Sequence, residues 1–379
     1  MNMNLRTSIV LFCLALTACD RGPMTLTIGM IVAQTGPAAA RGQDLVDGAS
    51  LAADEINAAH HMVGGRPLHI SIMVTDDQGD VARAKARVQE LLDSGVSAII
   101  GPLNTNQSAA VIPLTAARGI PQLITATGAS LTKVGKGNVL RLLANDDEQG
   151  RAMAVFAAQD LQARRVGTIV ESSDYGRGLA AAFTAASGAS SASMTSVASV
   201  SIAETGRVGA DTVGTFKAAN VDTIVLFGRE GHLTSLLEAL AAAGWRNVTV
   251  LGPNVIRNKQ AAQRDISILG LYATATAIDA KEFPDGSIFL AAFRKRFHTD
   301  PVWGAQYGYD AVYALADAAL QARTADGPKL LQTLKKIDPA TKVNQQMRFA
   351  ASGEQVYPNI AVYKVVERTW ALQAISAVW

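Results

Sequence analysis

The chain has 379 residues, of which 49 % are hydrophobic and 17 % are charged, and its formal net charge is +2. This is the composition of an ordinary folded protein, and the length favours two domains of about 150 residues each. No basic stripe is present, so nucleic acid is not expected as a partner.

The first residues predict an export signal. Met1 to Arg6 carries one positive charge, Thr7 to Leu16 is an apolar run, and Leu16-Thr17-Ala18-Cys19 follows. The run is shorter than the about 20 residues that span a bilayer, so a cleaved signal peptide over 1–18 is expected. The four residues that end at Cys19 resemble a bacterial lipobox, which implies that this cysteine is acylated and anchors the chain. Alternatively, a plain signal peptide ends near a cysteine.

Anchoring makes residues 19–25 a tether. Asp20 resembles the signal that retains lipoproteins at the inner membrane, so the expected location is the periplasmic side of the bacterial inner membrane. The two cysteines, Cys13 and Cys19, would both be consumed by processing, and a chain of this size can bury enough core without a disulfide. After Cys19 no apolar stretch is long enough to span a membrane.

Downstream of the tether, short apolar runs alternate with segments of helical period, which predicts a parallel sheet with helices on both faces. The expected strands are Leu26–Ile31, His69–Thr75, Ala98–Ile100 and Gln122–Ile124; the expected helices are Gln43–Ala59, one marked by Val81, Ala84, Val88 and Leu91, and Gln107–Arg118.

The same alternation starts again after Asn145, so we expect two doubly wound units in tandem. The expected strands are Val166–Val170, Thr195–Val200, Thr223–Phe227 and Val248–Leu251; the expected helices are Glu148–Leu161, Gly178–Ala186, Val208–Ala218 and His232–Ala243, with a loop over Ser187–Ser193.

The C-terminal elements are too few for a third domain and are expected to complete the two units. They are helices Ser287–Phe297 and Gln306–Gln321 and short strands Gln346–Phe349, Ile360–Val366 and Ala371–Ile375. The predicted fold class is therefore α/β, with two doubly wound parallel-sheet lobes joined by a hinge of several strands. Lobe 1 is expected over 26–144 plus 275–340, and lobe 2 over 145–274 plus 341–379. Several crossings of the chain between the lobes, lying side by side, form a hinge that permits the lobes to close on each other.

Motifs spread along the chain resemble, in order, the leucine/isoleucine/valine-type solute-binding proteins of ABC importers. They include Ile28-Gly29-Met30, Thr35-Gly36-Pro37, Ala53-Asp54-Glu55-Ile56-Asn57, Asp76-Asp77-Gln78, Gly101-Pro102-Leu103, Asp174-Tyr175-Gly176-Arg177-Gly178 and Tyr307-Gly308-Tyr309-Asp310-Ala311-Val312. The resemblance implies the type I periplasmic-binding fold, a monomer, and a small amino acid or related carboxylate bound between the lobes. Its partners would be an ABC permease and its ATPase.

Ligands of open parallel sheets bind beyond the carboxyl ends of the strands, where helix N-termini suit a carboxylate. The segment Asn104, Thr105 and Asn106 occupies such a place. The resemblance implies that Thr105 contacts the ligand carboxylate, although it could instead be an N-cap.

Three further parts of the ligand site follow from the resemblance. Thr125, Ala126 and Thr127 form a loop in which Thr127 contacts the ligand, or a simple turn. Tyr175 covers the ligand, or lies on the surface. Trp303 and Tyr307 line a side-chain pocket, or belong to the core.

The sequence departs from the family at three positions. Arg41 stands where an aromatic residue is common, and Asn254 stands where an acid pairs with the ligand ammonium. Glu230 either replaces that lost charge, or the ligand has no ammonium and Arg41 holds a second acidic group. We therefore expect a ligand other than leucine.

Patterns of catalysis are missing from the sequence: no Gly-x-Ser-x-Gly elbow, phosphate loop or His-Glu-x-x-His motif occurs. His60 and His61 are adjacent in a Gly-flanked loop and indicate solvated surface rather than a metal site. We expect a binding protein without cofactor. It is either a transport component or a ligand-binding sensor or scaffold lipoprotein acting on a receptor or cell-wall enzyme, and fold alone does not separate the two.

Overall fold

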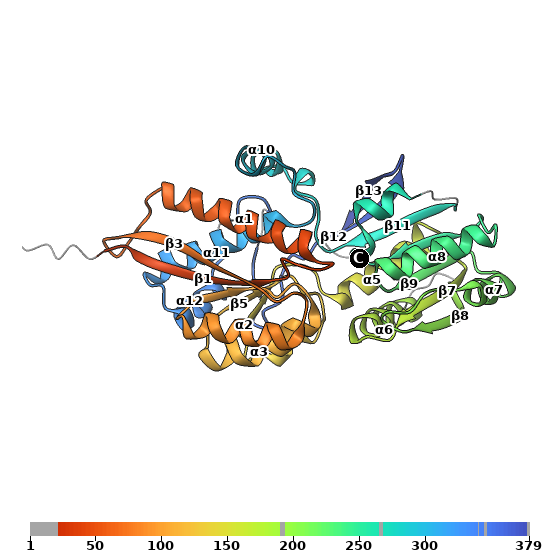
Figure 1. The fold of residues 1–379 in the computed structure, drawn as a ribbon, viewed down its shortest axis with the longest axis horizontal. Coiled ribbons are helices and arrows are strands. Elements are labelled where there is room, and N and C mark those ends of the chain that lie inside the picture. The colour runs from red at the N-terminus through yellow and green to blue at the C-terminus, as the bar shows by residue number, and fades with distance from the viewer. Residues whose placement is uncertain (1–21, 190–193, 265–267, 340, 345–346, 377–379) are drawn as a thin grey trace, which may run out of the picture.

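The computed structural model describes residues 22–189, 194–264, 268–339, 341–344 and 347–376. The expected signal peptide over 1–18, with Asp20 and Cys19, lies outside this range. Two sheets form two lobes side by side (Figure 1). No helix among the described residues is long and apolar enough to cross a bilayer.

The first sheet has six strands in the order β2-β3-β1-β4-β5-β6, and all of its pairs are parallel except β2 with β3. The bounds are β1 Met24–Val32, β2 Met62–Val63, β3 Arg66–Asp76, β4 Ala98–Ile100, β5 Gln122–Ile124 and β6 Val139–Arg141. Strands β4, β5 and β6 are buried along their length, as strands covered on both faces are.

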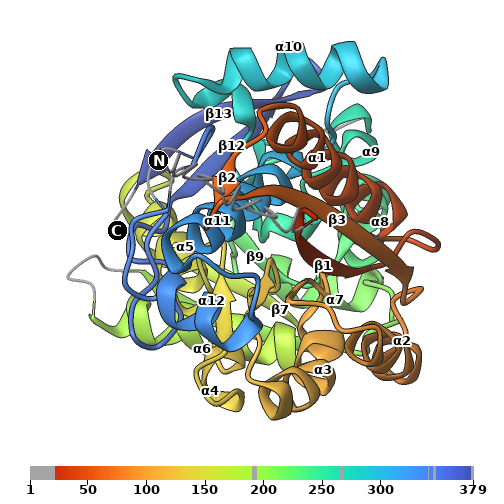
Figure 2. The same ribbon diagram turned by 90° about the vertical axis from the view of Figure 1, so that its left-hand side faces the viewer.

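Helices cover both faces of this sheet (Figure 2). The larger core lies under α1, α10, α11 and α12, and a smaller core lies under α2 and α3. The bounds are α1 Ala39–Ala58, α2 Val81–Asp93, α3 Thr105–Arg118, α4 Leu131–Val134, α10 Gly286–Phe297, α11 Ala305–Ala322 and α12 Gly327–Leu334.

Helices α1 and α11 approach so closely that only glycine fits at their contact. A Cβ atom on Gly48 would lie 1.8 Å from the Ala305 carbonyl oxygen, and one on Gly308 would lie 2.2 Å from that of Leu45. Helix packing thus explains Gly308, which stands in a motif noted in the sequence, and its counterpart Gly48 on α1.

The second sheet has the order β13-β12-β11-β10-β9-β7-β8, and its last two strands, β12 and β13, are antiparallel. Helices α5 and α6 cover one face, and α7, α8 and α9 cover the other. The strands are β7 Arg165–Glu171, β8 Thr195–Ile202, β9 Thr223–Phe227, β10 Thr249–Gly252, β11 Gly270–Ala275, β12 Ile360–Val366 and β13 Thr369–Ser376. The helices are α5 Asp146–Gln159, α6 Asp174–Ala189, α7 Ala210–Ala218, α8 Glu230–Ala242, α9 Lys259–Gln263 and the 3-10 turn η1 Asn254–Ile256. The 3-10 turn η2 Ala280–Glu282 packs against the first lobe instead.

The chain passes between the lobes after β6, after β11 and before β12. The predicted fold class is confirmed. The last passage lies later than the predicted boundary at 340/341, because Val343, Met347 and Phe349 pack into the first-lobe core. The strand expected over 346–349 is not formed in its described part, where Phe349 makes an isolated bridge to Gln355.

Candidate ligand-binding site

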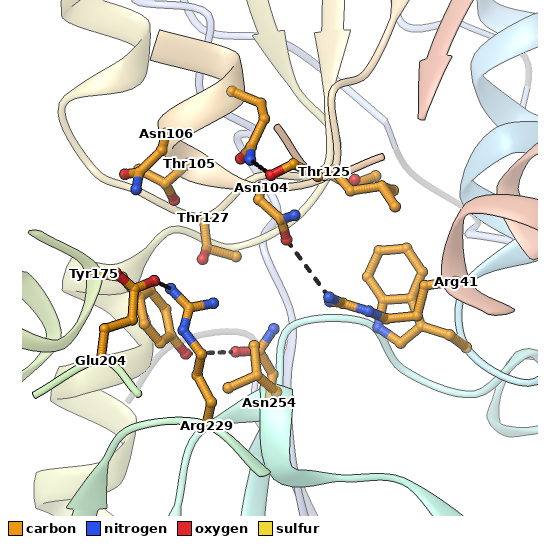
Figure 3. Close-up of a pocket in the computed structure, with 15 residues that line it drawn as sticks. Arg41, Asn104, Thr105, Asn106, Thr125, Thr127, Tyr175, Glu204, Arg229 and Asn254 are labelled. Atoms are coloured by element: carbon orange, nitrogen blue, oxygen red, sulfur yellow. Dashed lines mark hydrogen bonds and ion pairs between the residues drawn. The ribbon is translucent and has the colours of Figure 1, made fainter. Parts of the chain in front are cut away.

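A cavity of about 160 Å³ lies between the lobes, where the carboxyl ends of the parallel strands of both sheets meet (Figure 3). First-lobe residues line its upper and right sides in this view, and second-lobe residues line the lower left. Its lining residues are Arg41, Gly79, Leu103, Asn104, Thr105, Asn106, Gln107, Thr125, Thr127, Tyr175, Glu204, Arg229, Asn254, Val255 and Trp303.

The N-terminus of α3 forms part of the first-lobe wall. The helix begins at Thr105 and Asn104 takes the N-cap position without a side-chain cap, so Thr105 is not the N-cap. The backbone N–H groups of residues 105–107 have no hydrogen-bond partner within the described chain. Such free donors at the positive end of a helix favour an anion. Thr125 also lines the cavity; it is 3 % exposed, and its hydroxyl has no partner among the described residues.

Arg41 reaches the cavity from the first turn of α1. Its Nη2 lies 3.5 Å from Asn104 Oδ1, and its guanidinium carbon lies 5.6 Å from the centre of the Trp303 ring. Burial lowers the pKa of Arg41, and the positive charge of Arg229 lowers it further. Among the described residues no carboxylate lies within 4.0 Å of this guanidinium.

The segment that carries Trp303 is held by a carboxylate on the same helix as Arg41. Asp44, which is 5 % exposed, accepts the backbone N–H groups of Val302, Trp303, Gly304 and Ala305 at 2.8–3.0 Å. Helix α1 thereby fixes both the arginine and the indole that stacks on it.

The loop after β5 is held by a buried arginine. Arg141 on β6 is fully buried and donates to the carbonyl oxygens of Ala126 and, at 2.9 Å, Gly128. Its Nε donates to Glu354 at 2.8 Å. Thr127 lines the cavity and its hydroxyl donates to Asp146, while Ala126 is buried and contributes no lining atom.

The second-lobe wall consists of Tyr175, Asn254, Arg229 and Glu204. The buried Tyr175 hydroxyl donates to Asn254 Oδ1 at 3.2 Å. The Arg229 guanidinium lies 5.6 Å above the Tyr175 ring, donates through Nε to Glu171 at 3.1 Å and donates through Nη2 to Glu204 at 3.2 Å. Its Nη1 has no partner among the described residues, and the guanidinium faces the cavity (Figure 3).

Two of the predicted side chains lie outside the cavity. Glu230 begins α8 one position beyond the lining residue Arg229, so it cannot supply the lost carboxylate at the place expected. Tyr307 is buried on α11, where its hydroxyl accepts the Ile278 N–H at 3.2 Å, and it belongs to the core.

Sequence reasoning missed Arg229 and Glu204, although both follow the carboxyl ends of strands, β9 and β8. That position was itself the available signal. The structure brings together the other predicted residues: Arg41, Asn104, Thr105, Asn106, Thr125, Thr127, Tyr175, Asn254 and Trp303.

Burial of Asp146 predicts that the free energy of unfolding depends on pH. Asp146 begins α5 at the first passage between lobes; burial raises its pKa to about 7, with Thr127 and Arg141 acting in the opposite direction and Asp147 adding to the rise. Between about pH 4 and about pH 7 the folded state therefore holds a proton that the unfolded state releases, and stability falls as pH rises. We expect the unfolding free energy of Asp146→Asn, relative to the parent, to increase across this range by at most about 1.4 kcal/mol per pH unit.

Urea unfolding at a series of pH values measures this difference. Asp211→Asn, at an exposed position in the first turn of α7, is the control, and its difference from the parent should change much less with pH. A flat profile for Asp146→Asn as well would contradict the prediction.

Within the part of the chain that the structure describes, no cluster of His, Cys, Asp and Glu could hold a metal ion. His232, for example, accepts the Arg229 N–H at Nδ1 and faces the Ala203 carbonyl with Nε2, each at 3.1 Å, which uses both ring nitrogens.

Known proteins resemble this chain in sequence and in fold. The chain is 28 % identical over 287 residues to the Leu/Ile/Val-binding protein BraC3 of Rhizobium johnstonii, which covers 75 % of this chain and 76 % of the relative. Its structure resembles the branched-chain amino acid binding protein LivJ of Streptococcus pneumoniae in complex with isoleucine, with TM-score 0.78, 24 % identity, and 93 % and 99 % of the two chains covered. A solute-binding protein of Rhodopseudomonas palustris in complex with 3,4-dihydroxybenzoic acid gives TM-score 0.78, 21 % identity, and coverage of 94 % and 98 %.

These relatives are solute-binding proteins rather than enzymes, in agreement with the family that the sequence motifs resemble. The family model described as "periplasmic binding protein" matches residues 25–369, and the chain belongs to that family.

Proposed function

We propose that this protein is the extracytoplasmic solute-binding component of an ABC importer. It binds a small carboxylate, an amino acid or a related acid, in the interlobe cavity and delivers it to the permease and its ATPase. Acylation of Cys19 would hold it at the periplasmic face of the inner membrane, which raises its effective concentration at the transporter.

The observation that carries this proposal is the first-lobe wall of the cavity. Among the described residues, the N–H groups at the start of α3 have no hydrogen-bond partner and the Arg41 guanidinium has no carboxylate partner, and both face one space between the two lobes. Both are suited to a carboxylate. The ligands named with the similar structures, isoleucine and 3,4-dihydroxybenzoic acid, each contain that group.

The test is a thermal unfolding series on the chain from Asp20 onward, against amino acids and organic acids. A ligand that binds only the folded state adds about 2.7 kcal/mol of stability at a hundredfold excess over its Kd. We expect at least one small carboxylate to raise the melting temperature in proportion to the logarithm of its concentration.

Two variants locate the binding. Thr105→Val and Tyr175→Ala should each weaken the binding free energy of the identified ligand by about 1–3 kcal/mol, because each removes a polar contact at the cavity. Thr184→Val, on the exposed side of the helix that carries Tyr175, is the control and should bind normally. Full affinity in both cavity variants would place the ligand elsewhere.

A further inference from the structure

The hydrogen-bonding groups around the cavity favour a ligand that accepts hydrogen bonds. Several oxygen acceptors that an ammonium could use already accept a hydrogen bond within the protein. Asn104 Oδ1 accepts from Arg41, Asn254 Oδ1 accepts from Tyr175, and the Gly79 carbonyl accepts from Gln107.

The loop that follows β5 is occupied in the same way. Arg141 donates hydrogen bonds to the carbonyl oxygens of Ala126 and Gly128. The backbone N–H of Asp146 donates to the Thr127 carbonyl oxygen at 2.8 Å. Here three successive carbonyl groups are committed within the protein.

The donors, in contrast, are free. Within the described residues no partner is found for Arg229 Nη1, for the amide nitrogens of Asn104 and Asn254, for the hydroxyl of Thr125, or for the three N–H groups at the start of α3. Acceptor oxygens on a ligand satisfy these groups, whereas an ammonium brings only further N–H donors and satisfies none of them.

The charges around the cavity also disfavour a ligand with an ammonium group. Two guanidinium groups, from Arg41 and Arg229, face the cavity from opposite lobes (Figure 3). Glu204 is the one carboxylate in the described lining, and it is bonded to Arg229. Arg41 has no such partner. An ammonium would enter a space with two cations and a single carboxylate, one oxygen of which already accepts from Arg229.

The size and polarity of the cavity limit the ligand further. Its volume of about 160 Å³ is close to that of an engineered cavity of about 150 Å³ that holds benzene. Leu103, Val255 and Trp303 supply its larger apolar side chains, and most of the remaining lining is polar. A compact ligand with oxygens at both ends fits this lining better than one with a branched aliphatic side chain.

We propose that the site takes a small organic acid without an amine, namely a keto, hydroxy or dicarboxylic acid of about six carbons or fewer. One carboxylate lies against Arg41 and the N-terminus of α3, and a second acceptor oxygen lies against Arg229 Nη1. This assignment rests on the proposed function, because it names the ligand class of the same site.

Matched pairs of compounds that differ in the amine test it by titration calorimetry: glutamate with 2-oxoglutarate, and leucine with 4-methyl-2-oxopentanoate. We expect the oxo acid to bind more tightly in each pair, by tenfold or more. Amino acids that bind as tightly as their oxo acids would overturn the ligand class and leave the proposed function standing. Absence of binding by every acid and amino acid in the panel would overturn both.

Substitutions give an independent readout. Arg41→Gln should lower the affinity for the oxo acid by tenfold or more. Arg87→Gln, in an exposed ion pair on α2, should leave the affinity for the oxo acid unchanged. Glu204→Gln removes a negative charge beside Arg229 while keeping the side-chain shape, and it should tighten the oxo acid severalfold. If Glu204 instead receives an ammonium, the same substitution weakens the amino acid and overturns the proposal.

Discussion

Replacement of Glu354 by glutamine is expected to lower the free energy of unfolding by about 3–5 kcal/mol, because it leaves a buried guanidinium without its counter-ion. Arg141 is fully buried, and Glu354 accepts from its Nε at 2.8 Å and its Nη2 at 3.2 Å. Glu354 also accepts from Thr132 at 2.7 Å and from Asn145 at 3.3 Å. The Glu354 carboxylate therefore joins α4, β6 and the first passage between the lobes. Through Arg141 it also supports the loop after β5.

Urea unfolding of Glu354→Gln at neutral pH measures the loss. Glu90→Gln, in the exposed Arg87–Glu90 pair, is the control, and its expected cost is about 0–1 kcal/mol. Burial alone would raise the pKa of Glu354, but its bonds from Arg141, Thr132 and Asn145 hold that pKa below its ordinary value. The advantage of the parent over the variant should therefore shrink as pH falls through that lowered pKa. Equal costs for the two variants would refute the role given to Glu354.

Asp44→Asn should cost about 2–4 kcal/mol, because it disrupts an acceptor that holds four backbone N–H groups. Those groups belong to residues 302–305 and lie 2.8–3.0 Å from the carboxylate. An asparagine side chain offers one acceptor oxygen and turns an NH₂ donor toward other donors. The start of α11 and Trp303 would lose their attachment to α1.

The matched control is Asp47→Asn, one turn further along α1, where the carboxylate accepts from the Gln43 side chain at 2.7 Å. That change should cost less than about 1 kcal/mol. Both variants are compared by unfolding free energy and by affinity for the ligand, and Asp44→Asn should reduce both. A stable Asp44→Asn protein with intact affinity would show that Asp44 does not organise the site.

The fold was largely predictable because its strands are short apolar runs and its helices keep a regular apolar period. The helix expected over Gln306–Gln321 is α11 within one residue at each end. Helix α12 was missed, and β6 was missed because a three-residue strand that ends in arginine carries little apolar signal. Arg141 is buried in β6 because it is paired with Glu354, 213 residues away in the sequence. No local sequence pattern indicates such a pair.

The site was predictable where a residue follows a strand end and unpredictable where it depends on distant contacts. Thr105 and Asn254 follow β4 and β10, and both line the cavity. Glu230 was chosen for its charge, but the helix begins there and Arg229 is the residue that lines the cavity. Tyr307 was ambiguous because an aromatic residue on a helix faces either core or cleft, and only packing decides.

The attachment of residues 302–305 to Asp44 also bears on the order of events during ligand capture. Arg41 and Asp44 are three positions apart on one helix, so the arginine, the indole and the anchoring carboxylate form a unit within one lobe. These contacts all lie within the first lobe, so on the proposed function we expect little side-chain freedom to be lost when a ligand meets this half of the site. The ligand would then meet an ordered first lobe, with Tyr175 and Arg229 of the second lobe as further contacts.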